Sequence, residues 1–152
     1  MEIRSCLVDT NVLLRISKRS DPFHSLAFAA VNAMNVAGVP LFYTHQNIAE
    51  LWNVMTRPTD RNGFGLSVEQ AEREVQDIES GMNLVAEDET VYQRWRTLLT
   101  KYRIMGVQVH DAGLVASMQV HGIDHLLTFN TADFGRFLEI EIIHPAKLAQ
   151  QK

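Results

Sequence analysis

Short apolar runs alternate with longer segments of helical character along the chain, and this alternation constrains the fold more than any other feature. The runs expected to form strands are residues 3–8, 39–43, 82–85, 125–128 and 140–143. Strands separated by helices pair in parallel, because a right-handed crossover returns the chain to the same end of the sheet. The sequence therefore predicts one α/β domain over residues 1–152, with a parallel sheet of about five strands flanked by helices on both faces.

The expected helices carry start and stop signals. Asp21-Pro22 precedes one helix, Thr44 is a plausible N-cap for the next, and Ser67 with Gln70 forms a capping box for a third. The expected ranges are about 9–16, 23–37, 44–56, 67–81, 88–102 and 111–122. Residues 57–65 concentrate proline, glycine and short polar side chains, and are expected to be the longest irregular stretch.

Composition is that of an ordinary globular protein, with 46% hydrophobic and 21% charged residues among 152. Apolar runs are shorter than the roughly 20 residues that span a bilayer, and the first residues lack the apolar core of a signal peptide. Cys6 is the single cysteine, so no internal disulfide can form, and its apolar surroundings predict an inert core thiol. We therefore expect a cytoplasmic protein without membrane association.

Four segments that bear acidic or amide side chains are expected to meet at one edge of the sheet. Asp9 directly follows the first strand, while Asn130 and Asp133 follow the fourth. The helix of Glu50 begins just after the second strand, and Asp111 begins a helix that runs antiparallel to the strands. Ligands of open parallel sheets bind at the carboxyl ends of the strands. Topology alone therefore predicts a shared polar site.

Each of these residues also has an ordinary structural interpretation. Asp9 and Asp111 are both suitable helix N-caps, and Asn130 with Asp133 could simply organise a turn. Glu50 shares a helix face with a set of polar residues that could be no more than a solvated surface. The set is Gln46, Asn53 and Arg57.

A group of carboxylates at one edge makes most chemical sense as a site for a divalent cation, because neighbouring carboxylates repel one another unless they are protonated or bridged. Oxygen ligands suit magnesium or manganese, which lower the pKa of bound water and stabilise the charge that develops on phosphorus. Asp9, Glu50 and Asp111 are the expected ligands, with Asn130 or Asp133 completing the site. Glu50 could instead act as a general base through water.

The chain resembles the PIN-domain ribonucleases, and most closely their VapC toxin branch. The motifs that carry the resemblance are Val8–Leu13, Gln46–Val54, His110–Ala112 and Leu126–Phe134. The resemblance implies that Asp9, Glu50 and Asp111 are the core acidic residues of catalysis and metal binding. Asn130 stands at a fourth position that is often aspartate in the family, with Asp133 as a further candidate. The polar residues expected to support them are Thr10, Asn11 and Thr128.

The resemblance further implies hydrolysis of RNA phosphodiesters with magnesium or manganese, as the toxin of a type II toxin–antitoxin pair. The implied partners are RNA, a cognate antitoxin and a second copy of the chain. The formal net charge of −4 is not typical of a nucleic-acid binder. Arg15, Arg57 and Arg61 are nevertheless candidates for holding RNA phosphates, although each taken alone is more simply solvated surface.

Two other functions remain open from the sequence. A phosphatase could use Asp9 as a nucleophile, but such chemistry usually requires a second acid two residues later, where Asn11 stands. A catalytically weak PIN-like module that binds RNA or protein is compatible with Asn130 in place of an acid. Three retained carboxylates argue against the weak module, because a decayed site has no chemical reason to keep them.

Overall fold

The computed structural model describes residues 2–149, so the predicted domain limits at residues 1 and 152 lie outside it. Within this range one sheet of five strands has the order β3-β2-β1-β4-β5, and every neighbouring pair is parallel. The strands are β1 (Cys6–Val8), β2 (Leu41–Thr44), β3 (Asn83–Val85), β4 (His125–Leu127) and β5 (Glu141–Ile143). The predicted parallel α/β fold is confirmed.

Strand β1 occupies the centre of the sheet and marks the point where the strand order reverses. The chain runs outward from β1 through β2 to β3, then returns to the other side of β1 for β4 and β5. Ligands in open parallel sheets bind beside such a reversal, outside the carboxyl ends of the strands. The end of β1, where Asp9 follows Val8, is therefore the position at which the fold favours a site.

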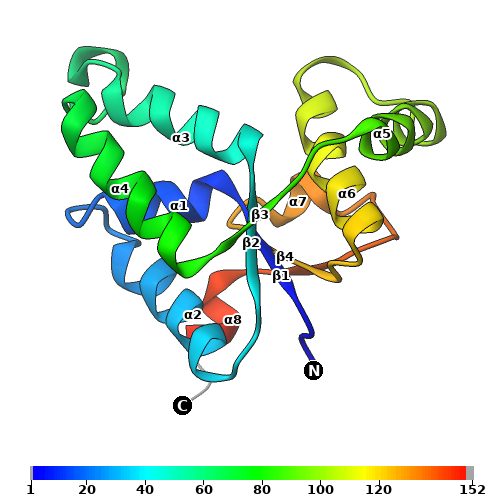
Figure 1. Cartoon of the computed structure of the whole chain (residues 1–152), viewed down its shortest axis with the longest axis horizontal. Coiled ribbons are helices and arrows are strands. Elements are labelled where there is room, and N and C mark those ends of the chain that lie inside the picture. The colour runs from blue at the N-terminus through cyan, green and yellow to red at the C-terminus, as the bar shows by residue number, and fades with distance from the viewer. Residues whose placement is uncertain (1, 150–152) are drawn as a thin grey trace.

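Helices cover both faces of the sheet (Figure 1). Those that the structure describes are α1 (Thr10–Ser17), α2 (His24–Val36), α3 (His45–Thr56), α4 (Val68–Gly81), α5 (Glu89–Lys101), α6 (Val109–His121), α7 (Thr131–Phe134) and α8 (Pro145–Ala149). Helices α1 to α4 and α8 lie toward one side in Figure 1, and α5 to α7 toward the other. No helix within residues 2–149 is both long enough and apolar enough to cross a membrane.

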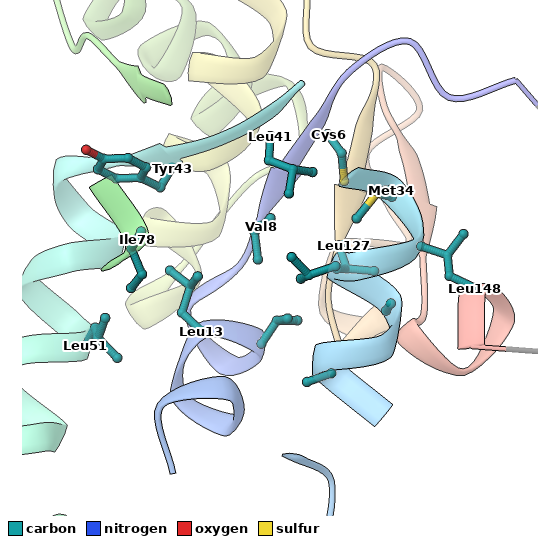
Figure 2. Close-up of a cluster of buried hydrophobic side chains, with 14 of the residues drawn as sticks. Cys6, Val8, Leu13, Met34, Leu41, Tyr43, Leu51, Ile78, Leu127 and Leu148 are labelled. Atoms are coloured by element: carbon teal, nitrogen blue, oxygen red, sulfur yellow. The ribbon is translucent and has the colours of Figure 1, made fainter. Parts of the chain in front are cut away.

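Two hydrophobic clusters result from the alternation of side chains along the strands. Cys6 and Val8 point into the cluster beneath α1 to α4 and α8, which Figure 2 shows. Leu7 points the opposite way, into the cluster beneath α5 and α6. Burial raises the pKa of the Cys6 thiol to about 12, so this thiol stays protonated at neutral pH, as expected for an inert core residue.

Several boundaries differ from the sequence-based prediction. Helix α6 begins at Val109 and not at Asp111, because a 3₁₀ turn (Gly106–Gln108) leads directly into it. Asp111 consequently lies within the first turn and is not the N-cap. The short helices α7 and α8 were not predicted, and the irregular stretch at 57–65 contains a 3₁₀ turn (Thr59–Arg61).

Candidate active site

Asp9 ends strand β1 and caps helix α1, and its side chain has more partners than a cap needs. Its Oδ1 accepts a 2.8 Å hydrogen bond from the backbone N–H of Thr10, which is the capping contact. Its Oδ2 accepts from the Thr128 hydroxyl at 2.8 Å and from Asn11 Nδ2 at 3.2 Å. The side chain is almost completely buried. The interpretation of Asp9 as an N-cap is therefore correct but incomplete.

The supporting polar residues form a network around Asp9. Asn11 Nδ2 donates to Thr128 Oγ1 at 3.0 Å, and Asn11 Oδ1 accepts from the backbone N–H of Phe129 at 3.1 Å. The Thr128 hydroxyl oxygen also accepts from the backbone N–H of Asn130 at 3.0 Å. This network joins the start of α1 to the segment after β4, and it holds the Asp9 carboxylate in one orientation.

Asn47 belongs to the same region, although sequence reasoning did not select it as a site residue. It is completely buried and forms a capping box with Thr44 at the start of α3. Its Nδ2 donates to Thr10 Oγ1 at 3.0 Å, which links α3 to the residue beside Asp9. The Thr44-x-x-Asn47 spacing was the available signal. Asn47 also lies four residues before Leu51, on the buried side of the helix.

Glu50 lies on the exposed face of α3, where Gln46 orients it. Gln46 Nε2 donates to Glu50 Oε1 at 2.8 Å. The same Nε2 donates to the backbone carbonyl of His110 at 3.3 Å. Gln46 thus connects the first turn of α3 with the first turn of α6, where Asp111 lies. Within the polar stripe predicted on α3, Glu50 and Asn53 are exposed, whereas Gln46 and Arg57 are half-buried.

Asp111 has the clearest electrostatic signature of a shared site. Partial burial is the largest cause that raises its pKa to about 6, and the carboxylates of Asp9, Asp133 and Glu50 raise it further. Burial likewise raises the pKa of Asp9, with further contributions from Glu50 and Asp133, while hydrogen bonds from Thr128 and Thr10 oppose the rise. Carboxylates of Asp9, which follows β1, and of α3, α6 and α7 therefore lie close enough to repel one another.

Asn130 and Asp133 are both exposed and belong to the start of α7. Asn130 is the N-cap residue, but its side chain makes no capping hydrogen bond. Asp133 lies in the first turn, where its carboxylate contributes to the repulsion felt by Asp9 and Asp111. The turn interpretation applies to both residues, and Asp133 in addition faces the acidic group.

The donor set fits a hard divalent cation, but its side chains are not arranged around one. Within residues 2–149 no three acidic, histidine or cysteine side chains lie close enough together to hold an ion as they stand. Asp9 is held by Thr128, and Glu50 by Gln46. None of the ion pairs between the described residues neutralises the acidic group. Oxygen ligands with unneutralised charge are those that magnesium and manganese prefer.

The three candidate arginines for RNA differ in what they contact. The Arg15 guanidinium forms a 3.0 Å ion pair with Asp21 and stacks 4.8 Å from the ring centroids of both Phe23 and Phe129. Arg57 ends α3 and donates from Nη2 to the backbone carbonyl of Asn62 at 3.1 Å.

Arg61 lies exposed in the 3₁₀ turn that follows α3. Arg15 and Arg57 therefore have structural roles in the described residues, while Arg61 presents its charge to solvent.

The protein is an α/β domain with an open parallel sheet and a group of carboxylates at the carboxyl ends of the central strands. The sequence profile of the PIN domain matches residues 6–138. The chain therefore belongs to the PIN-domain family. A comparison with curated protein sequences found no match.

Solved structures with the same fold include several toxin–antitoxin proteins. A toxin–antitoxin complex from Klebsiella pneumoniae is 20% identical, with a TM-score of 0.62, over 93% of this chain and 98% of that chain. VapBC2 from Rickettsia felis, bound to a DNA fragment from its promoter, is 14% identical with a TM-score of 0.66, over 91% and 97%. The sarcin–ricin loop cleaving toxin VapC20 of Mycobacterium tuberculosis is 20% identical with a TM-score of 0.61, over 90% and 99%. At these identities the likeness concerns the fold.

Proposed function

We propose that this PIN domain is a metal-dependent ribonuclease and the toxin component of a type II toxin–antitoxin pair. The observation that carries the proposal is the raised pKa of Asp111, about 6, which burial and three neighbouring carboxylates produce at the carboxyl edge of the sheet. Such repulsion between carboxylates is relieved when a cation binds between them. Membership of the PIN family and the fold shared with toxin structures support the proposal.

In this proposal Asp9, Glu50 and Asp111 hold magnesium or manganese, with Asp133 or the Asn130 amide oxygen as a further ligand. The bound ion would activate a water molecule and stabilise the charge that develops on phosphorus. Thr128 and Asn11 keep the Asp9 carboxylate oriented and favour its ionised form. Supporting hydrogen bonds of this kind tune both the geometry and the basicity of a ligand.

The role of Glu50 follows from its position on the surface of α3. Its carboxylate is exposed, is tethered through one oxygen by Gln46, and contributes to the raised pKa of Asp111. We assign it as a metal ligand. The alternative role, a general base that removes a proton from the attacking water, uses the same exposed carboxylate.

RNA is the proposed substrate, and an antitoxin the proposed protein partner. One structural neighbour is named as a toxin that cleaves the sarcin–ricin loop, and others are toxin–antitoxin complexes. Arg61 is the candidate that has an exposed charge for an RNA phosphate. We further propose that the protein acts in the cytoplasm as a homodimer, as the resemblance to VapC toxins implies.

A hollow of about 560 Å³ between α1, α2 and α4 is the proposed binding site of the antitoxin. Its lining includes the apolar Leu13, Val31 and Ile78, the carboxylates of Glu74 and Asp77 on α4, and the basic side chains of Arg19 and His24. An apolar peptide segment that also carries a lysine or arginine would complement the apolar residues and the carboxylates. Such a segment is the chemistry expected of an antitoxin that binds here.

The test is cleavage of a structured RNA pool by the wild type, by Asp9→Asn and by the exposed control Asp60→Asn, each with magnesium, manganese or EDTA. We expect metal-dependent cleavage by the wild type and by Asp60→Asn, and its loss in Asp9→Asn. Cleavage that persists in EDTA would contradict metal dependence. Equal cleavage by Asp9→Asn would remove the acidic group from the assigned role.

The alternative is a catalytically weak PIN-like module that binds RNA or protein. The observation in its favour is that no three ligand side chains within the described range are ready to hold an ion. Calorimetric titration with manganese separates the two functions. Heat that depends on Asp9 supports the nuclease, whereas no Asp9-dependent site, together with no cleavage, supports the binding module.

A further inference from the structure

A second hollow, of about 320 Å³, lies beside the acidic site, between α5, the first turn of α6 and the start of α3. Gln46 forms part of its wall, and the same side chain holds Glu50 at 2.8 Å. The hollow and the acidic group therefore share a residue. A pocket of this volume lies at the low end of the range for small ligands, roughly 300–1,000 Å³.

Two aromatic side chains of α5 line this hollow. Tyr92 and Trp95 have ring centroids 6.0 Å apart, and the Tyr92 side chain is 53% exposed. Trp95 Nε1 donates a 2.7 Å hydrogen bond to the Val109 carbonyl, which fixes the indole against α6. Arg96 donates to the Tyr92 hydroxyl at 3.2 Å. The two rings are tilted by 47°, so the exposed Tyr92 ring is the surface on which a flat ring can stack, with Trp95 beside it.

Gly113 of α6 forms part of the lining of the hollow. A Cβ atom at Gly113 would lie 3.4 Å from Gln46 Oε1 and 3.9 Å from Trp95 Cδ1. These are ordinary contact distances, so an alanine would fit without displacing its neighbours and would occupy space that the hollow now offers. Glycine is unfavourable within a helix. Because Gly113 has no side chain, the surface between Trp95 and Gln46 stays open.

The rim carries two carboxylates, Glu87 and Asp88, beside the amide of Gln46 and the imidazole of His110. Asp88 Oδ1 already accepts from the backbone N–H of Val91 as the N-cap of α5. Glu87 is exposed and lines the same hollow. Carboxylates repel phosphate but accept hydrogen bonds from N–H groups, so the rim disfavours the RNA backbone and favours the edge of a base. Guanine presents adjacent N1–H and N2–H donors, which match the two oxygens of one carboxylate.

We propose that this hollow binds one unstacked base of the RNA beside the cleaved phosphodiester, with a preference for guanine. The exposed Tyr92 ring stacks on the base, Trp95 packs against the edge of the base, and Glu87 accepts from its N1–H and N2–H groups. Sequence-specific RNA recognition generally uses such splayed bases, stacked on aromatic side chains and read on their edges. This inference rests on the proposed function for its substrate, but the pocket can be tested without cleavage.

The test uses Trp95 as a fluorescent reporter in EDTA. The chain has two tryptophans, so the variant Trp52→Phe leaves Trp95 as the single one. This protein is titrated with 5′-GMP, AMP, CMP and UMP, whose common phosphate is repelled equally by the carboxylates of the rim, so that differences between them report the base. We expect GMP to quench Trp95 and to bind about tenfold more tightly than UMP, the size of effect that stacking and one added hydrogen bond produce. Equal quenching by all four nucleotides would overturn the guanine preference.

Variants in the same background identify the contacts. Tyr92→Ala and Gly113→Ala should each weaken GMP binding about tenfold, and Glu87→Gln should remove the preference for GMP over UMP. Gly113→Ala should also raise the melting temperature, because alanine favours the helix, so weaker binding cannot be ascribed to unfolding. The control Phe28→Ala removes an exposed aromatic ring from the other hollow and should leave GMP binding unchanged.

The remaining outcomes separate this inference from the proposed function. GMP binding without RNA cleavage would leave the base pocket standing and remove the nuclease. RNA cleavage without any GMP-dependent quenching would support the nuclease and remove the base pocket. A Trp95 emission maximum that shifts with protein concentration and does not respond to nucleotide would show that a second copy covers the hollow. Quenching by an antitoxin peptide and not by GMP would assign the hollow to protein, and both results would overturn the proposal.

Discussion

The hydroxyl of Thr128 donates a 2.8 Å hydrogen bond to Asp9 Oδ2, although 119 positions separate the two residues in the sequence. The bond forms because β1 and β4 are neighbouring parallel strands, with Val8 paired to Leu127, so the residues that follow them emerge side by side. Thr128 is completely buried, so its hydroxyl cannot exchange Asp9 for water. This contact sets the orientation of the carboxylate around which the site is built.

Thr128→Val should weaken metal binding while the fold persists. Valine keeps the shape but removes the hydroxyl, and this leaves the buried Asp9 carboxylate short of a donor at a cost of about 2 kcal/mol. The loss also raises the pKa of Asp9 further, since this hydrogen bond lowers it. We expect manganese affinity to fall on the order of 10–100-fold, measured by calorimetry. Thr128→Ser keeps the hydroxyl and should retain affinity; equal losses in both variants would refute the hydrogen-bond explanation.

Asn47→Ala should destabilise the protein by about 2–4 kcal/mol, because it removes the Asn47 half of the capping box and a buried hydrogen bond together. The variant loses the contacts to Thr44 and leaves Thr10 Oγ1 without its donor. Urea denaturation monitored by circular dichroism gives the change. The exposed control on the same helix, Asn53→Ala, should stay within about 0.5 kcal/mol of wild type. Similar stabilities for the two variants would show that the buried network contributes little.

Asp111→Asn should stabilise the metal-free protein at neutral pH. Folding raises the pKa of Asp111 from 3.8 to about 6. A raised folded-state pKa gives a stability contribution that is complete below pH about 3.8 and lost as pH rises through about 6. The stability lost between these pH values is at most about 3 kcal/mol. Solvent screening of this half-exposed group reduces the loss to about 1 kcal/mol. Asparagine avoids the loss.

Urea denaturation in EDTA at pH 3.5 and pH 7.5 checks this expectation. The variant should gain about 1 kcal/mol over wild type at pH 7.5 and nothing at pH 3.5. Manganese should stabilise the wild type, by about 2.7 kcal/mol at a concentration 100 times the Kd, and should not stabilise Asp111→Asn comparably. A variant less stable than wild type at pH 7.5 would contradict the assignment of Asp111 to a repulsive group of carboxylates.

Arg15→Ala should destabilise the protein, whereas Arg61→Ala should leave its stability nearly unchanged. Removing Arg15 deletes an ion pair with Asp21 and the contacts with two rings, and should cost about 1–2 kcal/mol of stability. Arg61 is exposed, so its removal should change stability by less than about 0.5 kcal/mol. Thermal denaturation measures both.

The same two variants test the assignment of the RNA contacts. Arg61→Ala should weaken RNA binding and reduce the salt dependence by about 0.7 in the log–log slope, as expected for one lost phosphate contact with single-stranded RNA. Arg15→Ala should leave that slope unchanged. Fluorescence anisotropy with a labelled RNA at several salt concentrations gives the slopes. A lower slope in Arg15→Ala with unchanged stability would return Arg15 to the RNA-binding group.

The parallel sheet and the approximate position of the site could be predicted because both follow from local signals. Short branched runs between helical segments require crossovers, and crossovers require parallel strands. Asp9 directly follows Val8, so its place at the end of the first strand needs no tertiary information. The same applies to the capping box of Ser67 and Gln70, which the structure confirms. Asp111 was assigned to the correct edge, although its helix begins two residues earlier.

The partners of the polar side chains were decided by tertiary structure. Gln46 reaches the carbonyl of His110, 64 positions away, and Asn47 reaches Thr10, 37 positions away. Neither contact leaves a periodic signal in the sequence. The local pattern placed Arg15 with the candidate RNA contacts, and only the folded chain brings Phe129 against its guanidinium.

The amino-acid sequence by itself determined the sheet, its helical cover and the gathering of Asp9, Glu50, Asp111 and Asp133 toward one edge, because hydrophobic periodicity and chain connectivity act over short distances. Tertiary structure alone decided how these carboxylates are held, how far their pKa values rise and which hollows open beside them. Burial and charge repulsion depend on distances between segments that meet only after folding. The raised pKa values of these carboxylates are therefore set by the folded structure and not by the local sequence.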